Sequence, residues 1–299
     1  MRVGTAPISW GVSEMPAWGQ VLPAGQVLDE MAATGYAGTE LGPWGYLPDD
    51  VAQLRADLDR RGLALIGGFC PVTLHQPDRL SEQRQFALEV ARRLRDLGAG
   101  VLVLAEAGDA ARLAEAGQVT PGHTPAFGEE DWQRFAAGAE GIAAAAQDLG
   151  LITAFHPHVG SYVETAAEAE QLLRRTDPEV LGLCIDTGHL AYAGADPVQF
   201  TQQHRRRVRH VHVKDVSAAV LHQARTAHWS FAQAAAEEIF VPLGAGMVDL
   251  PAMMTALQSA GYAGWLVVEQ DRRLLSPEQA TLPREQARRS RETLRGLGL

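Results

Sequence analysis

The sequence has no surplus of basic residues and few cysteines. Its 26 basic side chains face 36 acidic ones, which gives a net charge of −10. A protein that binds the phosphate backbone of DNA or RNA needs a basic surface, so the composition argues against a nucleic-acid partner. Cys70 and Cys184 are too few for a disulfide framework, and both stand in apolar contexts. We therefore expect two buried free thiols.

Long apolar runs are also absent. The longest stretches are strand-sized and fall well short of the roughly 20 residues that cross a bilayer. The N-terminal Met-Arg-Val-Gly does not lead into the hydrophobic core of a signal peptide. These features predict a cytoplasmic protein without a membrane partner. Hydrophobic residues make up 46% of the 299 positions, and no linker or charge block divides the chain, so we expect one domain over residues 1–299.

Strand-like runs alternate with helix-like segments along the whole chain. Most runs are continuously apolar, as expected for a parallel sheet that is covered on both faces. The eight runs are 3–10, 37–42, 63–70, 100–106, 151–158, 180–189, 208–214 and 264–270. The clearest amphipathic segments between them are 51–62, 86–98, 131–150 and 166–176. This alternation predicts an α/β fold with a single (β/α)₈ TIM barrel and a C-terminal helix at about 284–296.

Two connections are longer than a barrel needs. The segment 216–249, after the seventh strand, contains Ser230 and Gln233 at capping-box spacing, which predicts an inserted helix. The segment 108–128 follows the fourth strand. Because long insertions at the catalytic rim usually cover the site, we expect both segments to act as lids.

Several of the later runs end in side chains that bind metals or transfer protons. Asp186, His212 and Glu269 lie at or near the ends of strands six to eight, and the carboxyl ends of barrel strands meet at one rim. Each alone could be a helix cap or an ion-pair partner, but together they suit a divalent ion with open positions for substrate. His156 and Glu164 are alternatives for a fourth ligand. Two imidazoles would favour Mn, Co, Fe or Zn over Mg.

Other polar residues near this rim are candidates for proton transfer or substrate binding. His158 lies two residues after His156 and faces the same side if the strand continues. Lys214 follows the seventh strand, where a nearby cation would lower its pKa. Alternatively, Lys214 forms an ion pair with Asp215. His189 is expected to bind substrate or to cap a helix.

Seven ordered motifs span residues 4 to about 273. They are GTAPISWG (4–11), AATGYAGTELGPWGYLP (32–48), FHPHVGSYVET (155–165), GLCIDTGH (182–189), HVHVKD (210–215), PLGAGMVDL (242–250) and VVEQD (267–271). The motifs resemble the xylose-isomerase-like TIM barrels, and specifically their inosose dehydratase branch. This resemblance implies a divalent metal, with Asp186, His212 and Glu269 as the second to fourth ligands. His156 stands where most members carry Glu, a change that the inosose dehydratase branch shares.

The resemblance also implies a reaction, the elimination of water from 2-keto-myo-inositol. A metal, with Mn or Co preferred and Zn, Fe or Mg as alternatives, would polarise the ring ketone while a base and an acid move protons. His158, Lys214 and Glu164 are the candidate proton-transfer groups. Trp10 and Glu40, at the ends of the first two runs, are candidates for sugar contact, although a core role competes for Trp10.

Other functions remain open. A keto-sugar isomerase or epimerase would share the first half-reaction through a metal-stabilised enediolate. A phosphodiesterase on this fold would need more metal ligands and a less acidic surface, and a sugar-binding protein without activity would need no metal. In each of the favoured cases the partner is a small polyol or keto-sugar. A homo-oligomer is compatible with the sequence.

Overall fold

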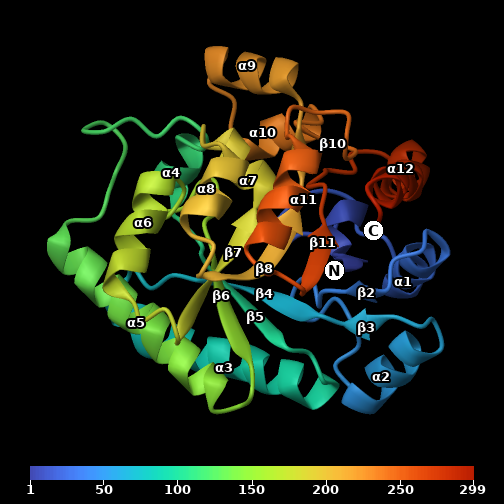
Figure 1. Cartoon of the computed structure of the whole chain (residues 1–299), viewed down its shortest axis with the longest axis horizontal. Helices are drawn as coiled ribbons and strands as arrows, with labels where there is room; N and C mark the ends of the chain where they lie inside the picture. The colour runs from blue at the N-terminus through green and yellow to red at the C-terminus, as the bar shows by residue number, and fades with distance from the viewer.

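The computed structural model describes residues 1–299 and shows a parallel barrel surrounded by helices (Figure 1). Nine strands form one sheet in the order β3-β2-β1-β11-β8-β7-β6-β5-β4. β3 (Ala64–Leu65) pairs with β2 and β4 (Gly67–Val72) pairs with β5, and only Ile66 separates the two. β3 and β4 are therefore two parts of one barrel strand, and the sheet closes with eight strand positions. The predicted TIM barrel is confirmed.

The remaining barrel strands are short and largely buried. They are β1 (Arg2–Thr5), β2 (Gly38–Thr39), β5 (Val101–Glu106), β6 (Ile152–His156), β7 (Leu181–Asp186), β8 (Val208–Val213) and β11 (Trp265–Val268). Parallel register pairs Ala105 with His156 and Asp186 with His212. The polar ends of β6, β7 and β8 therefore reach the same rim of the barrel. Cys70 and Cys184 are buried free thiols, as expected.

Amphipathic helices cover the outside of the barrel (Figure 1). They are α1 (Ala24–Ala33), α2 (Val51–Asp59), α3 (Leu80–Leu97), α5 (Glu129–Gln147), α6 (Ala166–Arg175), α8 (Pro197–Gln203), α11 (Leu250–Ser259) and α12 (Leu282–Gly296). In α3, Val90 and Leu94 are buried on one face, as their spacing of four requires. Gly98 ends this helix at φ 79°, a left-handed conformation that favours glycine. None of the helices combines the length and apolar character that crossing a bilayer would require.

Two predicted strands end earlier than expected and continue as helices. The run 3–10 leaves β1 and becomes the 3-10 helix η1 (Pro7–Trp10), because Pro7 has no N–H for the sheet and suits the first turn of a helix. The run 180–189 leaves β7 at Asp186, and α7 (Thr187–Tyr192) follows. Asp186 Oδ1 caps α7 by accepting a hydrogen bond from the His189 N–H at 2.8 Å.

Long connections pass over the carboxyl-terminal rim of the barrel. The connection after β8 contains β9 (Asp215–Val216), α9 (Ala218–Thr226), α10 (Phe231–Ala236) and β10 (Phe240–Val241). The Ser230 hydroxyl accepts from the Gln233 N–H at 3.2 Å and caps α10. The connection after β5 contains the short α4 (Ala110–Ala114). These segments are positioned to form walls above the barrel.

Candidate active site and metal centre

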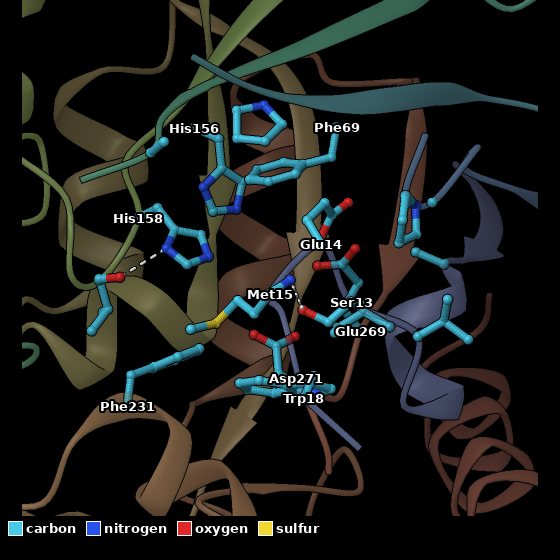
Figure 2. Close-up of a pocket in the computed structure, with 18 of the residues that line it drawn as sticks. Ser13, Glu14, Met15, Trp18, Phe69, His156, His158, Phe231, Glu269 and Asp271 are labelled. Carbon is cyan, nitrogen blue, oxygen red and sulfur yellow. Dashed lines mark hydrogen bonds between the residues drawn. The ribbon is translucent and has the colours of Figure 1, made fainter. Parts of the chain in front are cut away.

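A cavity of about 360 Å³ lies at the carboxyl-terminal rim of the barrel. This volume is in the range of pockets that hold small molecules. Figure 2 shows polar and apolar side chains around it, with Phe69 next to His156. The polar side chains include His156, His158, His212, Lys214, Glu269 and Asp271, and the apolar ones include Val12, Met15, Trp18, Phe69, Leu113 and Phe231.

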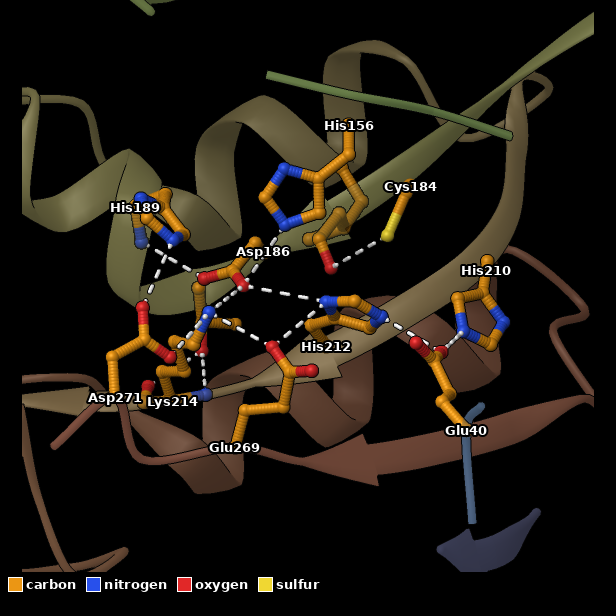
Figure 3. Close-up of polar contacts among 12 residues, drawn as sticks. Glu40, His156, Cys184, Asp186, His189, His210, His212, Lys214, Glu269 and Asp271 are labelled. Carbon is orange, nitrogen blue, oxygen red and sulfur yellow. Dashed lines mark hydrogen bonds and ion pairs between the residues drawn. The ribbon is translucent and has the colours of Figure 1, made fainter. Parts of the chain in front are cut away.

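Four side chains from neighbouring strands converge at the polar floor, where His156, His212 and Glu269 line the cavity and Asp186 lies against them without lining it (Figure 3). Asp186 Oδ2 lies 3.2 Å from His156 Nε2 and 3.6 Å from His212 Nδ1. Glu269 Oε2 lies 3.0 Å from the same His212 nitrogen. Donor atoms of Asp186, His212 and Glu269 all lie within 4.8 Å of one another. The structure thus brings together Asp186, His212 and Glu269, with His156, one of the two candidates for a fourth ligand, against Asp186, and we call these four residues the quartet.

The floor carries more negative charge than its own cations balance. The carboxylates of Glu40, Asp186, Glu269 and Asp271 are all buried, with exposed fractions of 7% or less. Lys214 Nζ is the lysine that faces them, at 2.9 Å from Asp186, 2.8 Å from Glu269 and 3.1 Å from Asp271. Because a buried charge without a partner is costly, a divalent cation would offset this surplus. The charge balance and the donor set therefore fit a metal ion.

Glu40 controls the orientation of His212. Its Oε1 accepts hydrogen bonds from Nε2 of His212 at 2.9 Å and from Nε2 of His210 at 2.7 Å. Nδ1 of His212 is thereby turned toward Asp186 and Glu269 and has no hydrogen-bond partner. Carboxylates commonly orient metal-binding imidazoles in this way. Burial acts to raise the pKa of Glu40, but the two imidazoles lower it overall, so the group is ionised.

Glu40 also lines the cavity, and no protein group donates to its Oε2. The predicted sugar contact is therefore compatible with its position. The barrel histidine His210 is buried and bonded to Glu40 one pleat below His212, and does not line the cavity.

Lys214 does not pair with its neighbour Asp215. Asp215 instead accepts backbone N–H groups from Gly244, Gly246 and Val248 at 2.9–3.0 Å and organises the loop after β10. Burial acts to lower the pKa of Lys214, but the three carboxylates around its Nζ raise the pKa well above the usual value. Without a bound cation, Lys214 is therefore a protonated donor at the cavity floor.

His158 presents a free ring nitrogen to the cavity. Its Nδ1 donates to the Val159 carbonyl at 2.8 Å, a bond that Figure 2 shows. Burial, helped by the neighbouring His189 and His156, holds the pKa of His158 well below its usual value. The ring is therefore neutral near pH 7, and its Nε2 carries a lone pair that can accept a proton.

His189 lies behind His158 rather than at the cavity surface. The two ring centroids are 3.9 Å apart, and His189 Nδ1 accepts from the Val159 N–H at 3.3 Å. His189 Nε2 lies 3.5 Å from Asp271 Oδ2. Because His158 covers it, His189 does not line the cavity. In this position His189 supports His158 and Asp271.

Two other expected site residues lie outside the cavity. Glu164 accepts the Gly117 N–H at 2.9 Å and the Gly160 N–H at 2.6 Å, so its carboxylate joins two loops. Its carboxylate therefore contacts backbone N–H groups rather than the residues of the floor. Trp10 is fully buried in the core, and its Nε1 donates to Glu30 at 2.8 Å. The turn into η1 carries Trp10 away from the rim.

The structure adds site residues that the sequence did not single out. Asp271 follows Glu269 by two residues and shares its side of the chain, a signal that alternation could have provided. Glu14 comes from the first loop, which has no recognisable pattern. Glu14 is solvent-exposed and lines the cavity together with Glu269 and Asp271.

Three loops form the wall above the floor. Phe231 of α10 and Leu113 of α4 line the cavity, so both long connections reach it. The third is the loop 11–23, between η1 and α1, which lines the cavity through Trp18. The Trp18 ring lies 6.0 Å from Phe231, and its Nε1 donates to the Arg272 carbonyl at 2.6 Å. The Arg273 guanidinium donates to the Trp18 carbonyl at 2.6 Å. Hydrogen bonds thus connect the loop that carries Trp18 to the segment that follows β11.

Comparison with known proteins agrees with this geometry. The family model described as xylose isomerase-like TIM barrel matches residues 28–297. An inosose dehydratase of Geobacillus thermodenitrificans is 33% identical, covering 96% of this chain and 95% of that protein. The rhizopine catabolism protein MocC of Rhizobium meliloti is 37% identical, covering 94% of this chain and 83% of that protein.

A similar fold occurs in the solved structure of the IolI protein, which contains a bound zinc atom. It aligns with a TM-score of 0.70 at 16% identity and covers 98% of this chain and 96% of that chain. The family model and the inosose dehydratase relatives cover nearly the whole sequence. The chain therefore belongs to the xylose isomerase-like TIM barrel family, in the branch that contains the inosose dehydratases.

Proposed function

We propose that the protein is a metal-dependent hydro-lyase that removes water from 2-keto-myo-inositol or a closely related cyclic keto-polyol. The observation that carries this proposal is the quartet at the floor of a small-molecule cavity, next to the free Nε2 of His158. The relatives named inosose dehydratase support the substrate class.

His156, Asp186, His212 and Glu269 would hold the metal. Two imidazoles and two carboxylates suit Mn²⁺ or Co²⁺, with Zn²⁺, Fe²⁺ and Mg²⁺ as alternatives. When bound, such an ion polarises the ring ketone and makes the neighbouring C–H more acidic.

The protein's own groups would move the protons. His158 Nε2 is the base that removes the proton next to the ketone, because this nitrogen is unprotonated and faces the cavity. Lys214 contacts three carboxylates and lines the same floor, so its ammonium group can donate the proton with which the departing hydroxyl leaves as water. The apolar wall of Phe69, Trp18 and Phe231 limits access of water.

The test is to incubate metal-reconstituted protein with a panel of inososes and ketohexoses. Dione absorbance reports dehydration, and chromatography reports sugar interconversion. Metal-dependent formation of the dione from an inosose is the expected result. Interconversion of ketoses without dione would favour an isomerase or epimerase, and full activity in a chelator-treated, metal-free sample would contradict the metal-dependent mechanism.

A further inference from the structure

A second hollow adjoins the metal cavity, and we call it the outer groove. It has a volume of about 620 Å³ and lies over the loops that follow β2 and β4 and over the start of α3. Both spaces are lined by Ser13, Glu14, Gly42, Pro43, Phe69 and Pro71. The outer groove therefore lies directly beside the cavity that contains the metal floor.

The outer groove contains an aromatic side chain that faces solvent. Trp44 is 47% exposed and is the only aromatic residue among the exposed large hydrophobic side chains. Its ring contacts the edge of Phe86, with centroids 6.0 Å apart, and the Arg93 guanidinium lies 5.0 Å from its centroid. Arg93 is itself held by the Leu47 and Pro48 carbonyls at 3.2 and 2.6 Å. The indole is therefore a supported, flat apolar surface, which suits stacking on a ligand ring.

The charged groups of the outer groove suit a neutral ligand. Arg79 is paired through two nitrogens with Glu82, at 2.6 and 3.2 Å. With this arginine neutralised and Glu14 at the junction, the groove has no surplus positive charge for a phosphate or carboxylate.

We propose that the outer groove is a subsite for an uncharged sugar ring attached to the cyclic keto-polyol. The keto ring lies over the quartet, and the apolar C–H face of the attached hexosyl group stacks on Trp44. This inference rests on the proposed function, because it assigns the inner cavity to the keto-polyol. It extends the substrate class from a single ring to a glycosylated one.

The experiment compares 2-keto-myo-inositol with keto-inositols that each carry one galactosyl group at a different ring position. We expect wild-type protein to turn over at least one galactosylated ketone, and Trp44→Ala to lower kcat/KM for it by about tenfold relative to the unsubstituted ketone. Ile152→Ala is the matched control. Ile152 is 49% exposed and begins β6 at the opposite end of the barrel, so its loss should leave this ratio unchanged.

Saturation-transfer NMR on the same ligands gives a readout that does not require turnover. Saturation of the galactosyl protons in wild-type protein, and its loss in Trp44→Ala, supports the subsite even if no dione forms, in which case only the proposed reaction fails. The subsite is overturned if the unsubstituted ketone is dehydrated but no galactosylated ketone binds, or if Trp44→Ala affects both ketones equally. The subsite would also be overturned if a phosphorylated inosose bound more tightly than the galactosylated one and if this binding depended on Trp44.

Discussion

Nε2 of His212 lies 2.9 Å from Oε1 of Glu40, so β8 and β2 are joined across the barrel although they are not neighbours in the sheet. Because this nitrogen donates to Glu40, the neutral ring carries its lone pair on Nδ1, which faces Asp186 and Glu269. Burial acts to lower the pKa of His212, whereas the nearby carboxylates raise it. The net result is a pKa well above the usual value. A metal ion would thus take the place of a proton.

Glu40→Gln should weaken metal binding without displacing a ligand. The amide keeps the volume of the side chain but removes the charge that holds the His212 Nε2–H, so we expect a loss of roughly 10-fold in metal affinity. Competition with a fluorescent chelator measures it. Glu130→Gln, at an exposed position of α5, is the control. Equal affinities of both variants would show that Glu40 does not tune the metal site.

His156→Ala and Glu164→Gln separate the two residues that the sequence offered as the fourth ligand. His156 lies 3.2 Å from Asp186 in the quartet, whereas Glu164 is bonded to two backbone N–H groups. We expect His156→Ala to lose most of its metal and Glu164→Gln to retain it, as measured by elemental analysis after gel filtration. Retention of the full metal content by His156→Ala would remove this residue from the ligand set.

His158→Gln should abolish most turnover while leaving the metal in place. Glutamine can keep a hydrogen bond to the Val159 carbonyl but cannot accept a proton, so kcat should fall by roughly 10²- to 10⁴-fold. Exchange of the substrate's α-proton with deuterated solvent should fall in parallel. If dehydration stops but exchange continues at the wild-type rate, the base is another group.

Much of the barrel could be predicted because apolar, strand-sized runs alternate with amphipathic helices, and strand ends in such a fold share one rim. Asp186, His212 and Glu269 meet for that reason. Loop residues were harder to place, since residue spacing does not predict which part of the protein a loop side chain contacts. Glu164 is used by the Gly117 and Gly160 N–H groups, which no local pattern indicates.

Residues in the loop between η1 and α1 and in the loop between β2 and α2 were missed for the same reason. Glu14 and Trp44 reach the cavity and the outer groove only because their loops fold over the rim. Trp10 shows the opposite case, in which Pro7 turns the chain into η1 and takes an apparent strand-end residue into the core.

The stability of the protein should depend on pH through Glu164. Burial raises the pKa of its carboxyl from 4.5 to about 7, even though the Gly160 N–H, the Arg112 charge and the Gly117 N–H favour the ionised form. A folded-state pKa above the unfolded value means that this group's contribution to stability is fully present below about pH 4.5. The contribution is lost as the pH rises through 7, because only the unfolded chain ionises freely.

Glu164→Gln removes this titration, so the free energy of unfolding of the wild type should fall relative to the variant between pH 4.5 and 7. The change should be about 3 kcal/mol at most, from a shift of the size given above. The lost hydrogen bond adds an offset that is independent of pH, so the slope is the test, measured by urea unfolding at several pH values. Glu237→Gln, at an exposed position, should run parallel to the wild type. A Glu164→Gln curve that also runs parallel would show that Glu164 is ionised in the folded protein with an ordinary pKa.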